Sequence, residues 1–365
     1  MRILRVAQKV YPDITGGGPY HVHAMSRDQA AAGHDVTVLT VRHDESLPRV
    51  EEQDGYTVVR YDPVVTLLGN DISPGLARYL RSVSDADVIH AHSHLYFATN
   101  LAALKRVVGE TPLAITNHGL YSQNAPEWVF DLYLRSLGRW TFNRADAVFC
   151  YTEADKRRVR EYGVSSRIDV VSNGIDAERF SPEGPEYDAI ESDGPVVLFV
   201  GRLVEGKRPS VALEAFASVA EAHPDARLYF CGEGPLQGEL EQQAHELGVG
   251  EAVSFLGQIP YDEMPAVYRS ADLFVLSSRA EGVPRTIMEA LSAGVPVVSS
   301  ALPQVRSAFG DDVAYAPIGD VDAFVDRMLE SLSESEDVGL GAEFSWERTV
   351  TETTAALASL VSESE

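Results

Sequence analysis

Short apolar runs alternate with longer amphipathic stretches along the first half of the chain. The run at residues 3–8 is followed by a helix-like stretch at 18–33. Runs of this length favour buried strands, and their alternation with helical patterns predicts a parallel sheet wrapped by helices. The strands expected in this half lie at residues 3–8, 34–41, 86–92, 112–119 and 145–152.

The same pattern begins again after residues 181–195, a passage rich in proline, glycine and acidic residues. At about 150 residues per domain, a chain of 365 residues also suggests two domains. We therefore expect an α/β protein with two Rossmann-like domains, 1–180 and 195–344, and a tail at 345–365 with helical spacing. The strands expected in the second domain lie at residues 196–203, 226–234, 252–258, 271–278 and 296–300.

The chain is strongly acidic, with 30 basic and 55 acidic residues and a net charge of −25. This charge disfavours nucleic acid as a partner. Lysine is scarce, and such depletion beside an acid excess resembles proteins of a high-salt cytoplasm, where screening relieves carboxylate repulsion. An ordinary acidic cytosolic protein is the alternative. The lysines are Lys9, Lys105, Lys156 and Lys207.

No targeting or membrane-spanning pattern is evident in the sequence. Residues 1–12 are too interrupted by charge for a signal peptide, and no apolar run approaches the ~18 residues of a spanning helix. Cys150 and Cys231 both lie in expected strands, which favours inert buried thiols over a disulfide or zinc site. We expect a soluble, cytoplasmic protein.

Three glycines, Gly16 to Gly18, separate the first expected strand from the helix that follows it. Backbone amides at such a junction can approach an anion, although a tight turn explains the glycines equally simply. Arg42 and His43 stand where a dinucleotide-binding site would carry an acidic residue, and the glycine spacing also differs from that of such a site. A nicotinamide-dependent dehydrogenase is therefore disfavoured.

Arg202 and Lys207 lie on the loop after the first strand of the second domain. Open α/β sheets bind ligands at the carboxyl ends of their strands, and two cations there suit the charges of a diphosphate. A solvated loop is the alternative.

Two carboxylates, Glu281 and Glu289, flank the start of a helix expected near Pro284. The amides of residues 283–286 would face an anion, and the two carboxylates could reach separate parts of one ligand. The simpler explanation is a helix start whose acidic residues suit the helix dipole.

His90, His92 and His94 alternate along an expected strand, which would place all three on one face and invites a metal site. No carboxylate or cysteine stands nearby to complete a ligand set, so we expect these histidines to line a cleft and expect no metal. His118 lies at the corresponding end of the next expected strand and should lie at the same edge of the sheet.

Taken in order, these motifs resemble the retaining glycosyltransferases of family four, which have the GT-B fold of two facing Rossmann-like domains. The resemblance rests on the GG-x3-H pattern that ends at His21, on the strand end at His118, on GRLVEGK and CGEGP, and on the E-x7-E signature. It also implies that the helix at 345–365 crosses back onto the first domain.

The resemblance implies a role for each residue of these motifs. Arg202 and Lys207 would hold the diphosphate of a nucleotide sugar, and His118 and Glu281 would lie at the donor sugar. We expect Glu289 to bind the ribose hydroxyls. The remaining donor-side residues are Gly17, Gly18, Gly232, Glu233, Gly282, Val283 and Pro284, and those on the acceptor side are Tyr20, His21 and His92. Val283 replaces the larger residue of many relatives.

The expected reaction is sugar transfer with retained anomeric configuration and without a metal or other cofactor, since Arg202, Lys207 and the helix N-terminus can stabilise the leaving diphosphate. A same-face displacement and a covalent intermediate on Glu281 both remain open. We favour UDP over GDP, with a glycan, lipid-linked or small-molecule acceptor. The alternatives are a non-catalytic nucleotide-sugar-binding subunit and an epimerase or phosphorylase of the same fold.

Two stretches, 73–87 and 126–144, are rich in basic and aromatic residues. A helix with such a face can lie on a bilayer, so these stretches suggest peripheral contact with the inner face of a membrane. Core packing with arginines that reach the surface is the alternative, and we favour it for the second stretch.

Overall fold

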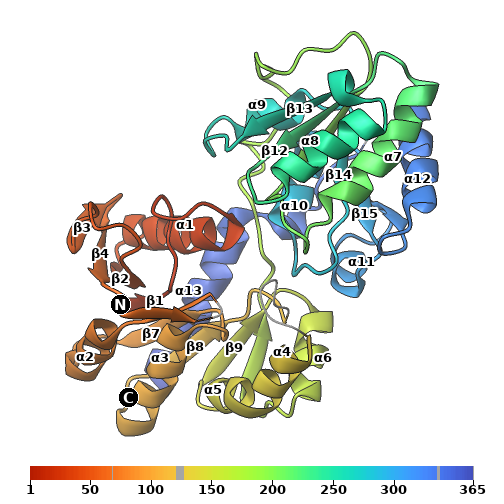
Figure 1. The fold of residues 1–365 in the computed structure, drawn as a ribbon. Coiled ribbons are helices and arrows are strands. Elements are labelled where there is room, and N and C mark those ends of the chain that lie inside the picture. The colour runs from red at the N-terminus through yellow and green to blue at the C-terminus, as the bar shows by residue number, and fades with distance from the viewer. Residues whose placement is uncertain (68, 121–126, 335–337, 365) are drawn as a thin grey trace. The chain divides into compact units, whose positions relative to one another are not determined.

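The computed structural model describes residues 1–67, 69–120, 127–334 and 338–364. The chain forms two compact units (Figure 1). Unit 1 comprises Met1–Ser172 together with Glu347–Glu365, and unit 2 comprises Asn173–Trp346. The passage 181–195, after which the sequence pattern begins again, belongs to unit 2.

Unit 1 contains an eight-stranded sheet with the order β10-β9-β8-β7-β1-β2-β4-β3. All neighbouring strands are parallel except β3, which runs antiparallel to β4. The order reverses between β7 and β1, so the loops after these two strands diverge at the carboxyl edge. The strands are β1 (Arg2–Val6), β2 (Asp35–Val41), β3 (Val50–Gln53), β4 (Tyr56–Tyr61), β7 (Val88–His92), β8 (Leu113–Thr116), β9 (Ala147–Cys150) and β10 (Arg167–Val170), and β5 (Val65–Leu67) pairs with β6 (Asn70–Ile72) in a separate hairpin.

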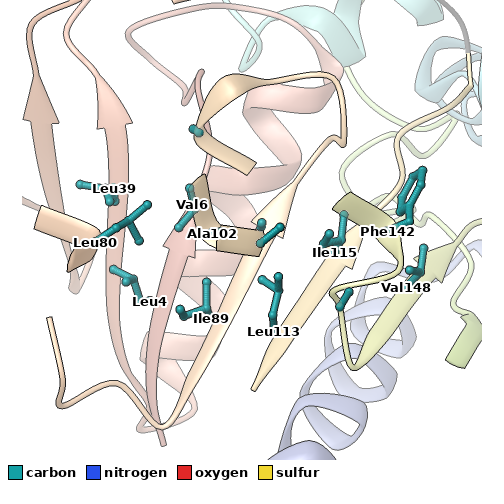
Figure 2. Packing of buried hydrophobic residues seen from close by; sticks show 14 of the residues in the cluster. Leu4, Val6, Leu39, Leu80, Ile89, Ala102, Leu113, Ile115, Phe142 and Val148 are labelled. Atoms are coloured by element: carbon teal, nitrogen blue, oxygen red, sulfur yellow. The ribbon is translucent and has the colours of Figure 1, made fainter. Parts of the chain in front are cut away.

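Alternate side chains of these strands enter two cores, one on each face of the sheet. On one face, Leu4, Ile89 and Val148 pack with Leu80 and Phe142 of the covering helices (Figure 2). The helices between β6 and β10 are α2 (Pro74–Ser82), α3 (Phe97–Val108), α4 (Glu127–Tyr133), the π-helical turn η1 (Leu134–Gly138), α5 (Arg139–Phe142) and α6 (Glu153–Glu161).

The opposite face is covered by α1 (Gly17–Ala31) and by α13 (Trp346–Ser364), the last helix of the chain. Leu357 and Leu360 of α13 are buried with Ile3 and Val36 of the strands. The expectation that the C-terminal helix returns to the first domain is therefore confirmed.

Unit 2 contains a six-stranded, wholly parallel sheet with the order β13-β12-β11-β14-β15-β16. The order reverses between β11 and β14, and open α/β sheets bind ligands at such a point. The strands are β11 (Val196–Val200), β12 (Arg227–Cys231), β13 (Val253–Gly257), β14 (Leu273–Leu276), β15 (Val297–Ser300) and β16 (Ala314–Ala316). The α-helices are α7 (Pro209–Ala222), α8 (Gln237–Glu246), α9 (Met264–Arg269), α10 (Arg285–Ser292), α11 (Pro303–Phe309) and α12 (Val321–Ser333), and two short 3-10 turns are η2 (Gly250–Ala252) and η3 (Ala342–Phe344).

The chain leaves and re-enters unit 1 through two segments that pair with each other inside unit 2. Ile175 and Ser345 form a parallel β-bridge. The Ile175 amide donates to the Phe344 carbonyl at 2.9 Å, and the Trp346 amide donates to the Ile175 carbonyl at 3.0 Å. Gly174 is required here because a Cβ would lie 2.4 Å from the Ser345 carbonyl oxygen.

Candidate functional site

An ion pair between Lys207 and Glu281 lies where the strand order of unit 2 reverses. Lys207 is on the loop after β11 and Glu281 is on the loop after β14, and Lys207 Nζ is 2.5 Å from Glu281 Oε1. The side chains are only 14% and 6% exposed. The Ser277 hydroxyl holds the two loops together by donating to the Arg208 carbonyl at 2.7 Å. The two charges predicted for the site are thus in direct contact.

The other cation predicted for the site on this loop, Arg202, is exposed. Its neighbourhood is shaped by the glycine turn after β12. Gly232 has φ 138°, and a Cβ there would lie 2.1 Å from the Gly201 carbonyl oxygen. The Leu203 amide donates to the Glu233 carbonyl at 2.9 Å. Gly232 and Glu233 therefore lie beside the cationic loop because only glycine permits this close backbone approach.

Glu289 projects from α10, which begins at Arg285, one residue after Pro284, as the sequence predicts. Glu289 is 4% exposed, and its carboxylate accepts a hydrogen bond on each oxygen. The Tyr261 hydroxyl donates to Oε1 at 3.0 Å and the Tyr268 hydroxyl donates to Oε2 at 2.9 Å. Burial, and then the adjacent Glu289 carboxylate, raises the pKa of Tyr268 well above its ordinary value, so this hydroxyl keeps its proton and remains a donor.

The turn between these two carboxylates is also buried. It contains Gly282, Val283 and Pro284, and the Glu281 carbonyl accepts from the Gln304 side-chain amide at 2.5 Å. This contact fixes the backbone that carries Glu281 just before the helix begins.

Arg285 also contacts this group of residues, although no role was predicted for it from the sequence. Its Nη1 donates to the Gly174 carbonyl at 2.9 Å and its Nη2 donates to the Tyr261 hydroxyl at 3.0 Å. Its Nε is 3.8 Å from Glu289 Oε1. The four-residue spacing of Arg285 and Glu289 on one helix was the available signal.

A second polar cluster lies at the carboxyl ends of β7, β8 and β9 in unit 1. His118 Nδ1 is 2.7 Å from the Tyr151 hydroxyl, and its Nε2 is 3.1 Å from His92 Nδ1. The ring of His21 lies edge-on to His118 with centroids 5.3 Å apart. Burial lowers the pKa of His118 to about 4, so its imidazole is neutral near pH 7. Tyr151 was missed, although it lies near the end of the strand expected at 145–152 and directly follows the observed β9.

Tyr20 does not join this cluster. Its ring packs against Tyr11 and His23, with centroids 5.5 and 5.8 Å away. Of the three residues predicted for the acceptor side, the structure therefore places His21 and His92 next to His118, and Tyr20 in a separate aromatic group.

His90 is held inside the core by Arg5. Arg5 Nη2 is 3.4 Å from His90 Nδ1, and His90 Nε2 is 2.7 Å from the Thr116 hydroxyl. A guanidinium only donates, so Nδ1 is the acceptor and neutral His90 carries its proton on Nε2. Arg5 also donates to Ser26 and Gln29 of α1, at 2.7 and 2.5 Å. Both ring nitrogens of His90 therefore serve the packing of unit 1.

The expectation that His90, His92 and His94 share one face is wrong for His94. Strand β7 ends at His92, and Ser93 adopts a left-handed conformation with φ 63°. The reversal turns His94 into the other core, where its ring centroid is 4.7 Å from that of Phe142. Across the described ranges, no group of three or more histidine, cysteine, aspartate or glutamate residues could hold a metal ion.

The glycine-rich loop of unit 1 is anchored by a buried ion pair. Gly17 and Gly18 are exposed at the start of α1, where first-turn amides have no acceptor within the helix. Arg60 of β4 binds both oxygens of Asp13, at 2.6 and 2.9 Å, and both side chains are 1% exposed. The ion pair therefore fixes the loop that carries the backbone amide donors at the start of α1.

Two further expectations concern the cysteines and the membrane. Burial raises the pKa of Cys150 and of Cys231 to about 12, which makes both thiols unreactive near neutral pH. In the part of the chain that the structure describes, none of the helices combines the length and the apolar character needed to cross a bilayer.

Two family models match the chain. The model described as "Glycosyltransferase Family 4" matches residues 15–179, and the model described as "Glycosyl transferases group 1" matches residues 183–338. The first match lies in unit 1 except for residues 173–179, which belong to unit 2, and the second match lies wholly within unit 2.

Relatives of known name match over most of their length. A glycogen synthase of Mycobacterium tuberculosis is 30% identical over 330 residues, which cover 82% of this chain and 78% of that protein. A D-inositol 3-phosphate glycosyltransferase of Mycolicibacterium smegmatis is 29% identical over 375 residues, covering 92% of this chain and 84% of the relative.

Solved structures share the fold at low sequence identity. The sucrose-phosphate synthase of Thermosynechococcus elongatus has a TM-score of 0.83 at 19% identity, and the match covers 100% of both chains. HepE of Anabaena, solved in complex with UDP-glucose, has a TM-score of 0.81 at 19% identity, with coverage of 98% of this chain and 100% of that one.

Proposed function

Because the chain belongs to glycosyltransferase family 4 and is a glycosyltransferase of the GT-B fold, we propose that it is a retaining enzyme that takes its sugar from a nucleotide-sugar donor. The observation that carries the proposal is the contact of Lys207 with Glu281 at the point where the strand order of unit 2 reverses. A UDP-sugar is the favoured donor and a GDP-sugar is the second choice. HepE of Anabaena, which binds UDP-glucose, supports this order.

Arg202 and Lys207 would hold the donor diphosphate and stabilise the charge that grows on it as the anomeric carbon–oxygen bond breaks. An ammonium has three donors, so Lys207 can keep its bond to Glu281 and still bind a phosphate oxygen. Two protein cations supply the stabilisation that a divalent metal gives in other enzymes, so we propose transfer without a metal or other cofactor.

Unit 1 would contribute neutral hydrogen-bonding groups and backbone amides. Gly17 and Gly18 lie at the N-terminus of α1 and offer amides to the donor diphosphate. His118 would bind the donor sugar as an uncharged imidazole, with Tyr151 and His92 fixing its ring. His21 and His92 would face the acceptor, whereas the packing of Tyr20 with Tyr11 makes its part indirect.

A same-face displacement fits the retaining proposal better than a covalent intermediate. In it, the bond from the anomeric carbon to the phosphate oxygen breaks, and the acceptor oxygen bonds to that carbon from the same side. The acceptor proton passes to the leaving phosphate. Glu281 shares one oxygen with the Lys207 ammonium at 2.5 Å, which reduces its nucleophilicity and suits it to stabilising positive charge on the sugar.

A peripheral contact with the cytoplasmic face of a membrane is supported by one surface of unit 1. The helices α2, α3, α4 and α5 with η1 cover the same face of the sheet. The exposed side chains of these helices include both apolar residues and arginines, although the chain as a whole is acidic. This combination suits an anionic bilayer. The exposed residues are Arg78, Arg81, Leu104, Val107, Val108, Trp128, Leu132, Arg135, Leu137 and Arg139. Pro126, the first residue of the stretch noted in the sequence, lies outside the described residues.

Two measurements on purified protein test the donor assignment. Thermal unfolding with UDP, GDP, ADP and their glucose conjugates should show a higher midpoint with one base, because a ligand of the native state stabilises it. Mass spectrometry of reactions with the selected sugar nucleotide should then show sugar transfer that survives excess chelator. Loss of activity with chelator and recovery with one metal would contradict the metal-free proposal.

The same measurements separate the alternative functions. A nucleotide-sugar-binding subunit would show the thermal shift but no transfer and no hydrolysis of the donor. A phosphorylase that uses pyridoxal phosphate needs a lysine for the cofactor, and the only lysine of unit 2, Lys207, is engaged by Glu281. An epimerase would convert the sugar nucleotide without an acceptor, which the mass and retention time of the product would reveal.

A further inference from the structure

Arg285 connects three features of unit 2 through one buried guanidinium. It donates to the Gly174 carbonyl and to the Tyr261 hydroxyl, and it lies within 3.8 Å of the Glu289 carboxylate. We propose that Arg285 is a positioning residue that orients Glu289, through Tyr261, for recognition of the donor ribose. The inference rests on the proposed function, since it assumes that a nucleotide occupies this site.

The direction of each hydrogen bond follows from the chemistry of the groups. A guanidinium has no acceptor, so the Tyr261 oxygen must accept from Arg285 Nη2 at 3.0 Å. The Tyr261 proton is then directed to Glu289 Oε1, which lies 3.0 Å away. The cation also polarises the phenol and strengthens its donation. At 3.8 Å, Arg285 Nε is too far from Oε1 for a hydrogen bond, so the hydrogen-bonded route runs through Tyr261.

The two tyrosines leave Glu289 with a defined capacity for a ligand. An ionised carboxylate has about four acceptor positions, two on each oxygen. Tyr261 occupies one position on Oε1 and Tyr268 occupies one on Oε2. One position remains on each oxygen, and the two neighbouring hydroxyls of a ribose need two such acceptors. The two tyrosines therefore leave Glu289 able to accept a hydrogen bond from each hydroxyl of a ribose diol.

The other end of the guanidinium is held by rigid backbone. Gly174 precedes the β-bridge between Ile175 and Ser345, and its close approach to the Ser345 carbonyl excludes any side chain. The Trp346 ring lies 5.8 Å from Arg285 Cζ. Because the guanidinium is a planar fork, fixing Nη1 on Gly174 also fixes Nη2 on Tyr261. A lysine has a single ammonium and cannot hold both acceptors in this geometry.

The test is the discrimination between UDP and 2′-deoxy-UDP, measured by calorimetric titration of the full chain. The wild type should bind UDP about 10-fold to 100-fold more tightly, as expected for one hydrogen bond to a charged group. In Arg285→Met, this ratio should fall by about 5-fold or more, and Arg285→Lys should restore it only in part. The KM for the sugar nucleotide should rise in both variants, with a smaller change in kcat.

Two further variants separate positioning from general stability. Tyr261→Phe removes only the hydroxyl between Arg285 and Glu289, so it should fold and show the same lower ratio as Arg285→Met. Arg269→Met is the matched control, because Arg269 also donates to backbone carbonyls of unit 2, those of Pro185 and Ser181, at 2.8 and 3.2 Å. It should lower the unfolding midpoint and leave the ratio unchanged.

Each other outcome counts against the inference. A wild-type ratio in folded Arg285→Met and Tyr261→Phe would overturn it while leaving the proposed function intact, as would equal affinity of the wild type for UDP and 2′-deoxy-UDP. An equally reduced ratio in Arg269→Met would show a general loss of structure and overturn it too. Failure of the wild type to bind UDP at all would overturn both the proposed UDP donor and the inference that rests on it.

Discussion

Lys207 Nζ lies 2.5 Å from Glu281 Oε1 although the two residues are 74 positions apart in the sequence. The contact exists because β11 and β14 are neighbours in the sheet, so that the loops after them share one edge. Since both side chains are largely buried, each depends on the other to offset the loss of hydration.

Glu281→Gln should keep the fold and lower the transfer rate by about 100-fold to 1000-fold, because glutamine retains a hydrogen bond to Lys207 but carries no charge. Lys207→Met should cost about 3–5 kcal/mol of unfolding free energy, since it leaves a buried carboxylate unpaired. The double variant should regain most of that stability and stay inactive. Denaturant unfolding and a transfer assay measure the two effects, and full activity in any of these proteins would contradict the assignment.

Arg60→Met should destabilise unit 1 and also weaken donor binding, because it removes the anchor of the loop that ends in Gly17 and Gly18. The buried partner Asp13 would be left unpaired, at a cost of about 3–5 kcal/mol. Arg106→Met is the matched control, since Arg106 makes a similar two-point contact with Asp146 away from the loop. Unchanged donor affinity in folded Arg60→Met would show that this ion pair serves stability alone.

Gly232→Ala should abolish donor binding, because its Cβ would lie 2.1 Å from the Gly201 carbonyl oxygen and would push the turn away from the cationic loop. A glycine of α8, Gly238, offers the control: a Cβ there meets nothing within 4 Å. Gly238→Ala should raise stability by about 0.5–1 kcal/mol. Calorimetric titration with the nucleotide distinguishes the two variants. Wild-type nucleotide affinity in Gly232→Ala would show that the close approach of Gly232 to the Gly201 carbonyl is not needed for donor binding.

The unfolding free energy should fall as the pH is lowered from 6.5 towards 5. Burial lowers the pKa of His118 to about 4 and of His94 to about 3, and holds the pKa values of His90 and His92 well below their ordinary range. In this window the unfolded chain binds protons that the folded chain refuses, so stability rises with pH. Each such histidine contributes a slope of up to about 1.4 kcal/mol per pH unit.

Urea unfolding at several pH values measures this slope. His118→Gln removes one of the titrating groups and should make the slope shallower, whereas a flat profile in the wild type between pH 5 and 6.5 would contradict the burial of these imidazoles as neutral groups.

High salt should stabilise the protein. The 25 excess negative charges repel one another, and the screening length falls from about 10 Å at 0.1 M to about 3 Å at 1 M ionic strength. The unfolding midpoint should therefore rise between roughly 0.1 M and 1 M KCl, a salt chosen instead of sulfate because sulfate also strengthens apolar burial. A midpoint independent of KCl would favour the ordinary acidic cytosolic protein.

The fold could be predicted because its signals are local. Buried strands are short apolar runs, and those expected in both halves correspond to β1, β2, β7, β8, β9 and β11 to β15. The return of the last helix was also predicted, through family resemblance. Strand β3 was not assigned, since Val50–Gln53 is half exposed at the edge of the sheet and holds one apolar residue beside two glutamates and a glutamine. Strands β4, β5, β6, β10 and β16 were not assigned either.

The partners within the site could not be predicted in the same way. The sequence placed Lys207, Glu281 and Glu289 on loops and a helix, but their contacts with each other and with Tyr261 depend on which strands are neighbours. His94 was misplaced because one residue, Ser93, takes a left-handed conformation that no pattern of alternating histidines reveals. Tyr151 had a readable position at a strand end, yet only the structure shows its bond to His118.

The burial of Leu357 and Leu360 in unit 1 sets an order on the biosynthesis of the protein. When residues up to Ser172 have left the ribosome, one face of their sheet still lacks α13, and the whole of unit 2 must be translated before that helix exists. Unit 2, which is continuous in sequence, can fold during translation, whereas unit 1 completes its core only after Trp346 has been passed. A nascent first unit thus leaves apolar strand residues uncovered until its own C-terminal helix has been made and packs over them.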